Sequence, residues 1–286
     1  FDWVQRVSID LTSRMLATLF DFPFDQRHKL AYWSDLATAA PETTGGQVDR
    51  DEGFRAAADM ARHMSLLWRE KEARKAAGKP MGFDLISLLL ENEHTRDMIS
   101  RPMEFIGNMV LLIVGGNDTT RNAISHGVNL LHVNPEQRRI WQDDLDGVTA
   151  TAVEEIVRVA SPVTFMRRTV TRDLTLSGHD LVEGDKMILF YGAANRDPKE
   201  FDDPETFDVR RDPNTHIGFG GPGPHFCLGA HLARREINVA FRQMLTRLPD
   251  IEVVGDAVPL DARGIPLVAG LKHLPVRFTP TAKVGA

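Results

Sequence analysis

The sequence has very little cysteine: one among 286 residues, so no disulfide can form within the chain. Nothing in the fold then depends on an oxidising compartment, and the cytoplasm is the expected location. Positive charge is not in excess either, because 34 Lys and Arg stand against 40 Asp and Glu for a formal net charge of -6. Such a chain has no bulk field to hold nucleic acid or an anionic membrane.

Long apolar runs are also missing. The longest, Met109–Val114, is far shorter than the roughly 20 residues that cross a bilayer, so no membrane span is expected. The first residues, Phe1–Arg6, lack the basic start and apolar run of a secretion signal, and they begin inside a hydrophobic pattern without Met. We therefore expect an N-terminally incomplete globular chain, and its composition, 42% hydrophobic and 26% charged, argues against disorder or a coiled coil.

Hydrophobic spacing predicts a helical first half. Up to about residue 74, apolar side chains recur every three or four positions, and breaks at Pro23, Pro41–Gly46 and Gly78–Gly82 divide this part into three or four helices. No proline interrupts residues 103–134, which predicts one helix of about thirty residues through the middle of the molecule. Another helix is expected over Ala150–Val159.

The second half reads as small β elements around one further helix. Residues Phe165–Leu189 suggest short strands with turns at Ser177-Gly178 and Glu183-Gly184, a helix is expected over Leu228–Leu245, and short strands follow up to Phe278.

We thus expect a single domain over residues 1–286, mainly α with small β-sheets. Its helical core would span residues 1–160. The β pieces and a glycine-rich loop would occupy residues 161–286.

The sole cysteine ends that glycine-rich loop, His216–Gly229. Four glycines before Cys227 let the backbone approach another body closely. The start of the next helix favours a thiolate, through unpaired N–H groups and the positive end of the dipole, and such a thiolate suits an axial ligand to haem iron. A buried, inert thiol is the plainer interpretation of a lone cysteine. Zinc held by His225, Cys227 and His231 is a third, which lacks a fourth ligand nearby.

The long helix contains a weak segment, Gly115–Thr120, with the sequence Gly-Gly-Asn-Asp-Thr-Thr. These six poor helix formers cost about 2–4 kcal/mol relative to alanine. A threonine hydroxyl here can bond the carbonyl four residues back and open the turn, which leaves room for a ligand and water. The alternative is an exposed kink that carries a stray acid.

Together the loop and the weak segment resemble the cytochrome P450 family. The parts of its cysteine loop are matched by Phe219, Gly223, His225, Cys227 and Gly229, although the phenylalanine lies eight residues before the cysteine, where seven is the commonest spacing. The resemblance implies a haem-thiolate fold that lacks its N-terminal part. It also implies haem b (iron protoporphyrin IX) as the cofactor and the cysteine as the iron ligand.

Further roles follow from the same resemblance. Asp118 and Thr119 match the acid and alcohol that deliver protons to iron-bound oxygen in the family, and their presence favours reductive activation of O2 over use of peroxide. Arg168 and His225 match positions that bind the haem propionates, a charge-assisted role that suits the arginine. Either of these two could instead be an ordinary surface cation.

Charged residues elsewhere fit the same family pattern. Glu155 and Arg158, three apart on a helix, would alone be a surface pair of little energy. With Arg211 they match the P450 network that locks the fold behind the haem. Arg234 and Arg235 could receive an acidic ferredoxin, although solvated surface charge is the simpler interpretation of each.

Two groups of segments suggest the substrate class. Phe1–Val4, Tyr32–Asp35 and Leu111–Asp118 look like bacterial medium-chain alkane hydroxylases, whereas Phe165–Arg168 and Ala194–Asp197 look more like hydroxylases of methyl-branched lipids and sterol side chains. Both kinds of enzyme attack the end of an alkyl chain.

The resemblance therefore implies a monooxygenase that hydroxylates the terminal carbon of an apolar small molecule, namely an alkane, a fatty acid or a branched lipid. It would use O2 and two electrons from ferredoxin and ferredoxin reductase. The alternatives are a peroxide-driven haem oxidase and a non-catalytic remnant that binds haem or lipid.

Overall fold

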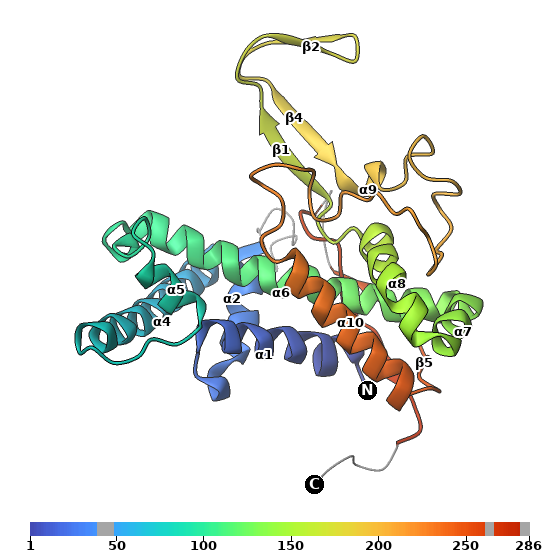
Figure 1. The fold of residues 1–286 in the computed structure, drawn as a ribbon, viewed down its shortest axis with the longest axis horizontal. Coiled ribbons are helices and arrows are strands. Elements are labelled where there is room, and N and C mark those ends of the chain that lie inside the picture. Colours follow the sequence, from blue (N-terminus) through green and yellow to red (C-terminus); the bar gives the residue numbers. More distant parts are fainter. Residues whose placement is uncertain (39–48, 261–265, 281–286) are drawn as a thin grey trace.

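The computed structural model describes residues 1–38, 49–260 and 266–280, which form a helical body with a projecting β-arm (Figure 1). The long helix α6 (Pro102–Val133) crosses the molecule, and the other helices pack around it. It confirms the helix of about thirty residues predicted from the lack of proline. The other helices are α1 (Ile9–Phe20), α2 (His28–Thr38), α4 (Arg50–Ala76), α5 (Leu85–Glu91), α7 (Pro135–Asp143), α8 (Leu145–Ala160), α9 (Tyr191–Ala194) and α10 (Ala230–Arg247).

Two hydrophobic clusters form the core, and α6 contributes to both. One cluster contains Trp141, Ile156 and Ile124, where α6 packs against α8 and α10. The other contains Trp68 and Met109, where α6 packs against α1, α2 and α4. The long helix therefore joins the two halves of the core into one body.

The weak segment of α6 stays α-helical throughout, so the open turn expected at residues 115–120 is not present there. The predicted back-bond does form, because the Thr119 hydroxyl donates to the Gly115 carbonyl at 2.8 Å. Packing stabilises the segment further. A Cβ atom on Gly116 would lie 2.7 Å from Cδ2 of Leu16, so glycine lets α1 approach α6 closely.

The strands pair into small antiparallel sheets, as the sequence predicted. The turns at Gly178 and Gly184 have φ angles of 81° and 93°, in the left-handed region that glycine favours. Two pairs build the arm in Figure 1, and two lie near the chain ends. The pairs are β1 (Phe165–Thr169) with β4 (Lys186–Phe190), β2 (Leu174–Leu176) with β3 (His179–Leu181), β5 (Glu252–Val253) with β8 (Val276–Arg277), and β6 (Val258–Pro259) with β7 (Leu271–His273).

The largest difference from a predicted helix boundary lies at the start of α8. The helix expected from Ala150 begins at Leu145, because the Asp144 carboxylate accepts the Gly147 N–H at 2.8 Å and caps the helix there. Helix α7 is an additional element outside the predicted ranges, and Pro135 at its first position favours its start.

The charged network behind the cysteine loop is present and deeply buried. Arg158 and Glu155 form a two-bond ion pair, each bond 2.8 Å long, and neither side chain has any exposed surface. Arg211 Nε donates to the same carboxylate at 3.3 Å. The remaining guanidinium hydrogens of Arg158 reach three backbone carbonyls, so the buried charges are fully hydrogen bonded. The pair is far more than the surface bridge that its spacing alone suggests.

Among the helices that the structure describes, none is long and apolar enough to cross a membrane.

Candidate functional site

The cysteine loop ends at the first turn of α10, on the side of α6 from which the β-arm projects (Figure 1). The Cys227 N–H donates to the Phe219 carbonyl at 2.9 Å, which closes the loop into a compact turn. Gly220 and Gly223 have φ angles of 87° and 135°, which side-chain-bearing residues rarely adopt. The glycines thus present the thiol at the mouth of the helix.

The thiol of Cys227 is exposed, which contradicts the interpretation as a buried small hydrophobe. Apolar side chains lie open to water on either side of it in the sequence, with Leu228 86% exposed and Phe226 44% exposed. On α6, Leu111 is 68% exposed. Large apolar side chains rarely stay in water without a partner, so these residues indicate a surface that receives an apolar body.

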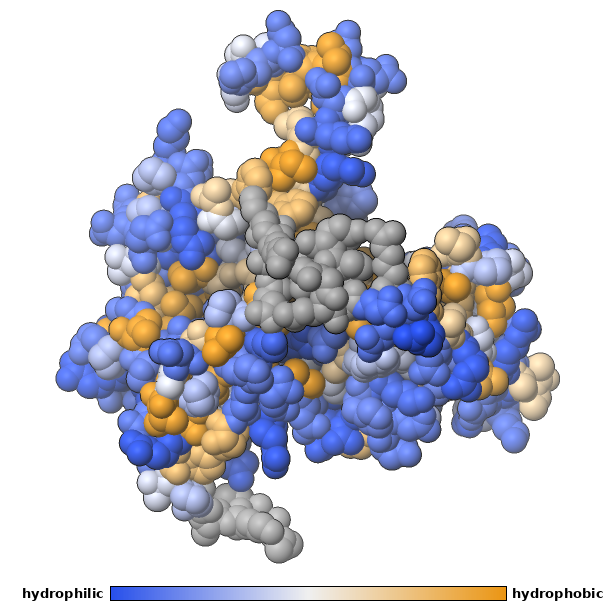
Figure 2. Space-filling model, turned by 180° about the vertical axis from the view of Figure 1, so that it is seen from behind, coloured by the Kyte–Doolittle hydropathy of each residue, from blue (hydrophilic) through white to orange (hydrophobic). Residues whose placement is uncertain are grey.

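The β-arm adds further exposed apolar side chains. Met166 on β1 is exposed, as are three consecutive residues of β4, Ile188–Phe190. Figure 2 shows apolar residues along the arm from the opposite side. The arm thus presents an open apolar surface that includes Met166.

The two residues predicted to bind the propionates, Arg168 and His225, are exposed. Arg168 donates only to the neighbouring Arg167 carbonyl, at 3.1 Å, and no carboxylate of the described residues lies within ion-pair distance of it. The side chain of His225 has no hydrogen bond to another described residue. These residues form a donor set that fits haem b. It comprises an exposed thiol, apolar side chains open to water, and an arginine without an ion-pair partner among the described residues.

The predicted proton relay residues point to different surroundings. Asp118 is 1% exposed, and its carboxylate accepts hydrogen bonds from Ser34 at 2.8 Å and Thr38 at 3.2 Å. Arg121 forms an ion pair with it at 3.1 Å. Thr119 is half-buried and keeps its hydroxyl on the Gly115 carbonyl. The acid is therefore anchored to α2, whereas the alcohol is not.

Ser34 and Thr38 were not among the candidate residues of the sequence. Their spacing of four places both hydroxyls on one face of α2. That spacing is common on helix surfaces, so only the packing of α2 on α6 reveals what it does.

The cysteine loop is connected to α8 and α10 by a cluster that we call the arginine clamp. It consists of Arg234, Glu154, His216 and Phe219. Arg234 donates two hydrogen bonds to Glu154, at 2.6 and 2.8 Å, and His216 Nε2 lies 3.0 Å from the same carboxylate. Burial alone would raise the pKa of Glu154, but the bonds from His216 and Arg234 and their charges outweigh it and lower the pKa to about 2.

The clamp changes the interpretation of the two arginines on α10. The fork of Arg234 is committed to Glu154, so its charge is not free for an external partner. Arg235, the next residue, is exposed.

Among the described residues, Arg121, His126 and Glu236 are titratable side chains with a buried atom that lacks a hydrogen-bond partner. Burial shifts the pKa of the last two. His126 on α6 has a buried Nε2 without a partner, and burial lowers its pKa to about 4. Glu236 on α10 has a buried Oε2 without a partner, and burial raises its pKa to about 8. Neither stood out in the sequence, because isolated His and Glu residues on helices are usually solvated.

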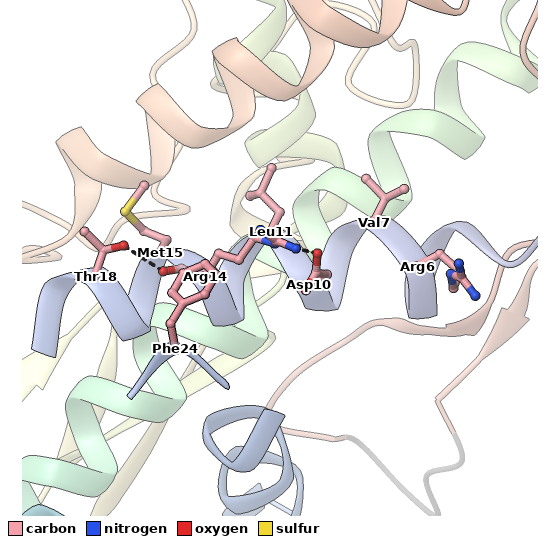
Figure 3. A pocket seen from close by; sticks show the side chains of 8 residues that line it. All are labelled: Arg6, Val7, Asp10, Leu11, Arg14, Met15, Thr18 and Phe24. Atoms are coloured by element: carbon pink, nitrogen blue, oxygen red, sulfur yellow. Dashed lines mark hydrogen bonds and ion pairs between the residues drawn. The ribbon is translucent and has the colours of Figure 1, made fainter. Parts of the chain in front are cut away.

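A separate surface hollow lies on the outer face of α1 (Figure 3). Val7, Leu11 and Met15 form its apolar floor, and Arg14 lies over the ring of Phe24, with its guanidinium carbon 5.4 Å from the ring centroid. None of the groups that we place around the thiol lines it, so it is not a candidate for the chemistry.

A helical fold built on α6, with an exposed cysteine at the mouth of α10, is the arrangement expected of a haem-thiolate protein. The family model of Cytochrome P450 matches residues 49–254, and the chain belongs to the cytochrome P450 family. Haem b is the cofactor of that family, in agreement with the donor set.

Curated relatives agree in sequence. A "Methyl-branched lipid omega-hydroxylase" of Mycobacterium tuberculosis is 40% identical over 280 residues, which are 97% of this chain and 62% of the relative. A "Steroid C26-monooxygenase" of Mycolicibacterium smegmatis is 34% identical over 282 residues, 99% of this chain and 62% of the relative. The chain thus spans about three fifths of the length of these relatives.

Solved structures agree in fold. A Mycobacterium marinum cytochrome P450 in complex with pseudoionone has a TM-score of 0.88 at 35% identity, covering 97% of this chain and 65% of that one. Cytochrome P450-153 from Novosphingobium aromaticivorans has a TM-score of 0.82 at 37% identity, with the same two coverages. The expected P450-like fold is confirmed.

Proposed function

We propose that this chain carries the haem-binding and proton-handling part of a monooxygenase that hydroxylates the terminal carbon of an alkyl chain. The substrate is an alkane, a fatty acid or a branched lipid. The observation that carries the proposal is the exposed sole thiol at the start of α10, surrounded by unpartnered apolar side chains. Similarity to an omega-hydroxylase supports attack at a chain end.

The predicted site residues have separate roles in this proposal. Cys227 binds the iron, and Phe219, Gly223 and Gly229 shape the loop that presents it. Bound haem b supplies the activation of O2 at its iron. Arg168 and His225 bind the two propionates and hold the ring between the loop and α6. Their exposure and lack of carboxylate partners support that role.

Proton handling falls to α6. Thr119 holds a proton on Oγ1, which it can turn from the Gly115 carbonyl towards the open side of the helix. Asp118 supplies protons from the interior, and the hydroxyls of Ser34 and Thr38 keep its carboxylate in place.

The overall reaction consumes one O2, two electrons and two protons. One oxygen atom enters the C–H bond and the other leaves as water. We propose that ferredoxin and ferredoxin reductase supply the electrons, because the sequence shows no flavin or nicotinamide fingerprint. The exposed Arg235 is available to an acidic partner. The cytoplasm suits a chain without disulfides.

The decisive experiment is the spectrum of the reduced, CO-bound protein after haem loading, compared with Cys227→Ala. We expect the red-shifted band of thiolate-ligated haem in the parent and its loss in the variant. Equal spectra from the two proteins would refute thiolate ligation. Turnover of fatty acids that proceeds with peroxide alone would instead favour the peroxide-driven oxidase.

A further inference from the structure

The arginine clamp joins three separate parts of the chain behind the cysteine loop. Arg234 comes from α10, Glu154 from α8, and His216 and Phe219 from the loop itself. The guanidinium carbon of Arg234 lies 4.3 Å from the centroid of the Phe219 ring, within the range of a cation–π contact. The His216 ring lies 5.9 Å from the same ring.

This arrangement fixes the direction of the guanidinium. Two parallel bonds to one carboxylate are the geometry that only an arginine fork provides. The fork bonds Glu154 along its edge, and its face rests on Phe219. Because its pKa is lowered to about 2, Glu154 is ionised at physiological pH and carries the charge that pairs with Arg234.

The clamp is also connected to the thiol. The ring of Phe219 contacts the guanidinium of Arg234. The carbonyl of the same residue accepts a hydrogen bond from the Cys227 N–H at 2.9 Å. The pKa of Arg234 is raised, first by the hydrogen bonds to Glu154 and to a smaller extent by the charge of Cys227. Through Phe219, the guanidinium of Arg234 and the backbone of Cys227 thus belong to one connected cluster.

We propose that Arg234 is a positioning residue that places a permanent positive charge beside the sulfur of Cys227, with Glu154 and Phe219 holding it there. The charge withdraws electron density from the thiolate and favours uptake of an electron by the iron it binds. Only the second of these consequences rests on the proposed function. The first concerns the chain alone.

The chain-only test uses the sole cysteine as the probe. Iodoacetate and iodoacetamide both alkylate a thiolate, but only iodoacetate is an anion, so the ratio of their rates at one pH reports the local potential. The fraction of thiolate cancels in that ratio. Four variants are compared with the parent: Arg234→Gln, Arg234→Met, Arg234→Lys and Arg235→Gln.

Removing the charge should lower the iodoacetate-to-iodoacetamide ratio about threefold, the order of effect that the loss of one nearby charge has in water. Arg234→Met keeps an apolar stem against Phe219, so it serves if the glutamine variant does not fold. Arg234→Lys should retain the parent ratio within about 1.5-fold, because the charge remains. The matched control Arg235→Gln should also stay within that range, because its side chain is exposed and its charge is screened by water and salt.

An unchanged ratio in both neutral Arg234 variants would overturn the proposal, as would an equal drop in Arg235→Gln. A merely structural role would change both alkylation rates together and leave the ratio constant.

The haem-loaded protein gives the second readout. Arg234→Gln should make reduction of the iron less favourable by up to tenfold, which is 59 mV for one electron, and Arg235→Gln should not. If the chain gives no thiolate-haem spectrum, the proposed function fails, whereas the alkylation ratio still decides whether Arg234 sets the potential at the sulfur.

Discussion

The buried titratable side chains of this protein differ in whether their polar atoms have hydrogen-bond partners. Glu155 and Arg158 are completely buried, and hydrogen bonds satisfy both. His126 and Glu236 are buried with one polar atom unpartnered, and their pKa values move towards the neutral form in response. A buried group whose polar atoms all have hydrogen-bond partners therefore keeps its charge. A buried histidine or glutamate that lacks a partner is shifted towards its neutral form.

Removing one member of the satisfied pair should be costly. Glu155→Gln leaves Arg158 buried without a counter-charge, so we expect a loss of about 3–5 kcal/mol in the free energy of unfolding. Urea unfolding followed by circular dichroism measures it. The matched control is Glu136→Gln, which breaks the exposed pair with Arg139 at the same spacing and should cost less than about 1 kcal/mol. Equal costs for the two variants would contradict the buried network.

The pKa of His126 predicts a loss of stability in acid. Its folded pKa, about 4, lies below the unfolded 6.5, so the unfolded state takes up the proton first as pH falls. Between pH 7 and 5 the parent should lose about 2 kcal/mol that His126→Gln does not lose. Unfolding at both pH values measures the difference. The exposed His94→Gln should keep the parent slope, and a parent slope in His126→Gln would show that the imidazole finds a partner.

The pKa of Glu236 predicts the opposite pH dependence. Its folded pKa is raised to about 8 from 4.5, so the protonated form is favoured in the fold and the associated stability is lost as pH rises from 4.5 to 8. Glu236→Gln should therefore gain stability relative to the parent as pH increases through that window. A constant difference across the window would argue against a neutral Glu236.

At the scale of elements, glycine positions on α6 control how closely other helices approach. A Cβ atom on Gly127 would lie 2.5 Å from Cζ of Phe241 and 2.9 Å from Cδ1 of Ile156, both within the core. One on Gly107 would meet nothing within 4 Å. Of these two glycines in the same helix, packing thus requires only Gly127.

Alanine substitutions at these two positions should have opposite effects. Gly127→Ala should destabilise the protein by about 1–3 kcal/mol through overpacking, although alanine favours helix. Gly107→Ala should stabilise it by up to about 1 kcal/mol, since only helix propensity changes there. Thermal and urea unfolding of both variants measure this pair, and stabilisation by Gly127→Ala would show that α10 can shift away.

At the scale of the whole molecule, α6 unites two core clusters that would otherwise be separate. Met109 and Ile124 lie on the same helix but in different clusters. Each cluster also has its own buried tryptophans, Trp68 in one and Trp141 in the other. Disturbance of one cluster should therefore reach the other through the helix.

Met109→Ala tests that coupling. It leaves a cavity in one cluster and should cost about 2–5 kcal/mol. Each cluster is reported in turn by fluorescence in a background without the tryptophans of the other cluster, namely Trp3→Phe with Trp141→Phe, or Trp33→Phe with Trp68→Phe. We expect both clusters to unfold at the same, lowered urea concentration. Two separated transitions, with only one shifted by Met109→Ala, would show that the clusters unfold independently.

The sequence by itself determined the elements that depend on local pattern. Apolar spacing and the absence of proline predicted α6, and the turn glycines predicted the short strands of the β-arm. The glycines before Cys227 predicted a loop whose backbone can approach another body closely. These features depend on backbone conformational freedom and hydrophobic periodicity, and both are set by residues that are close together in the sequence.

Only the tertiary structure decided which partner each charge meets. It turned Asp118 towards Ser34 on α2, buried Glu155, and committed Arg234 to Glu154 and Phe219. Each of these contacts joins residues far apart in the chain, except for the pairing of Glu155 with Arg158. Side-chain direction and burial depend on how helices pack. The sequence pattern of one helix does not show which other elements pack against it.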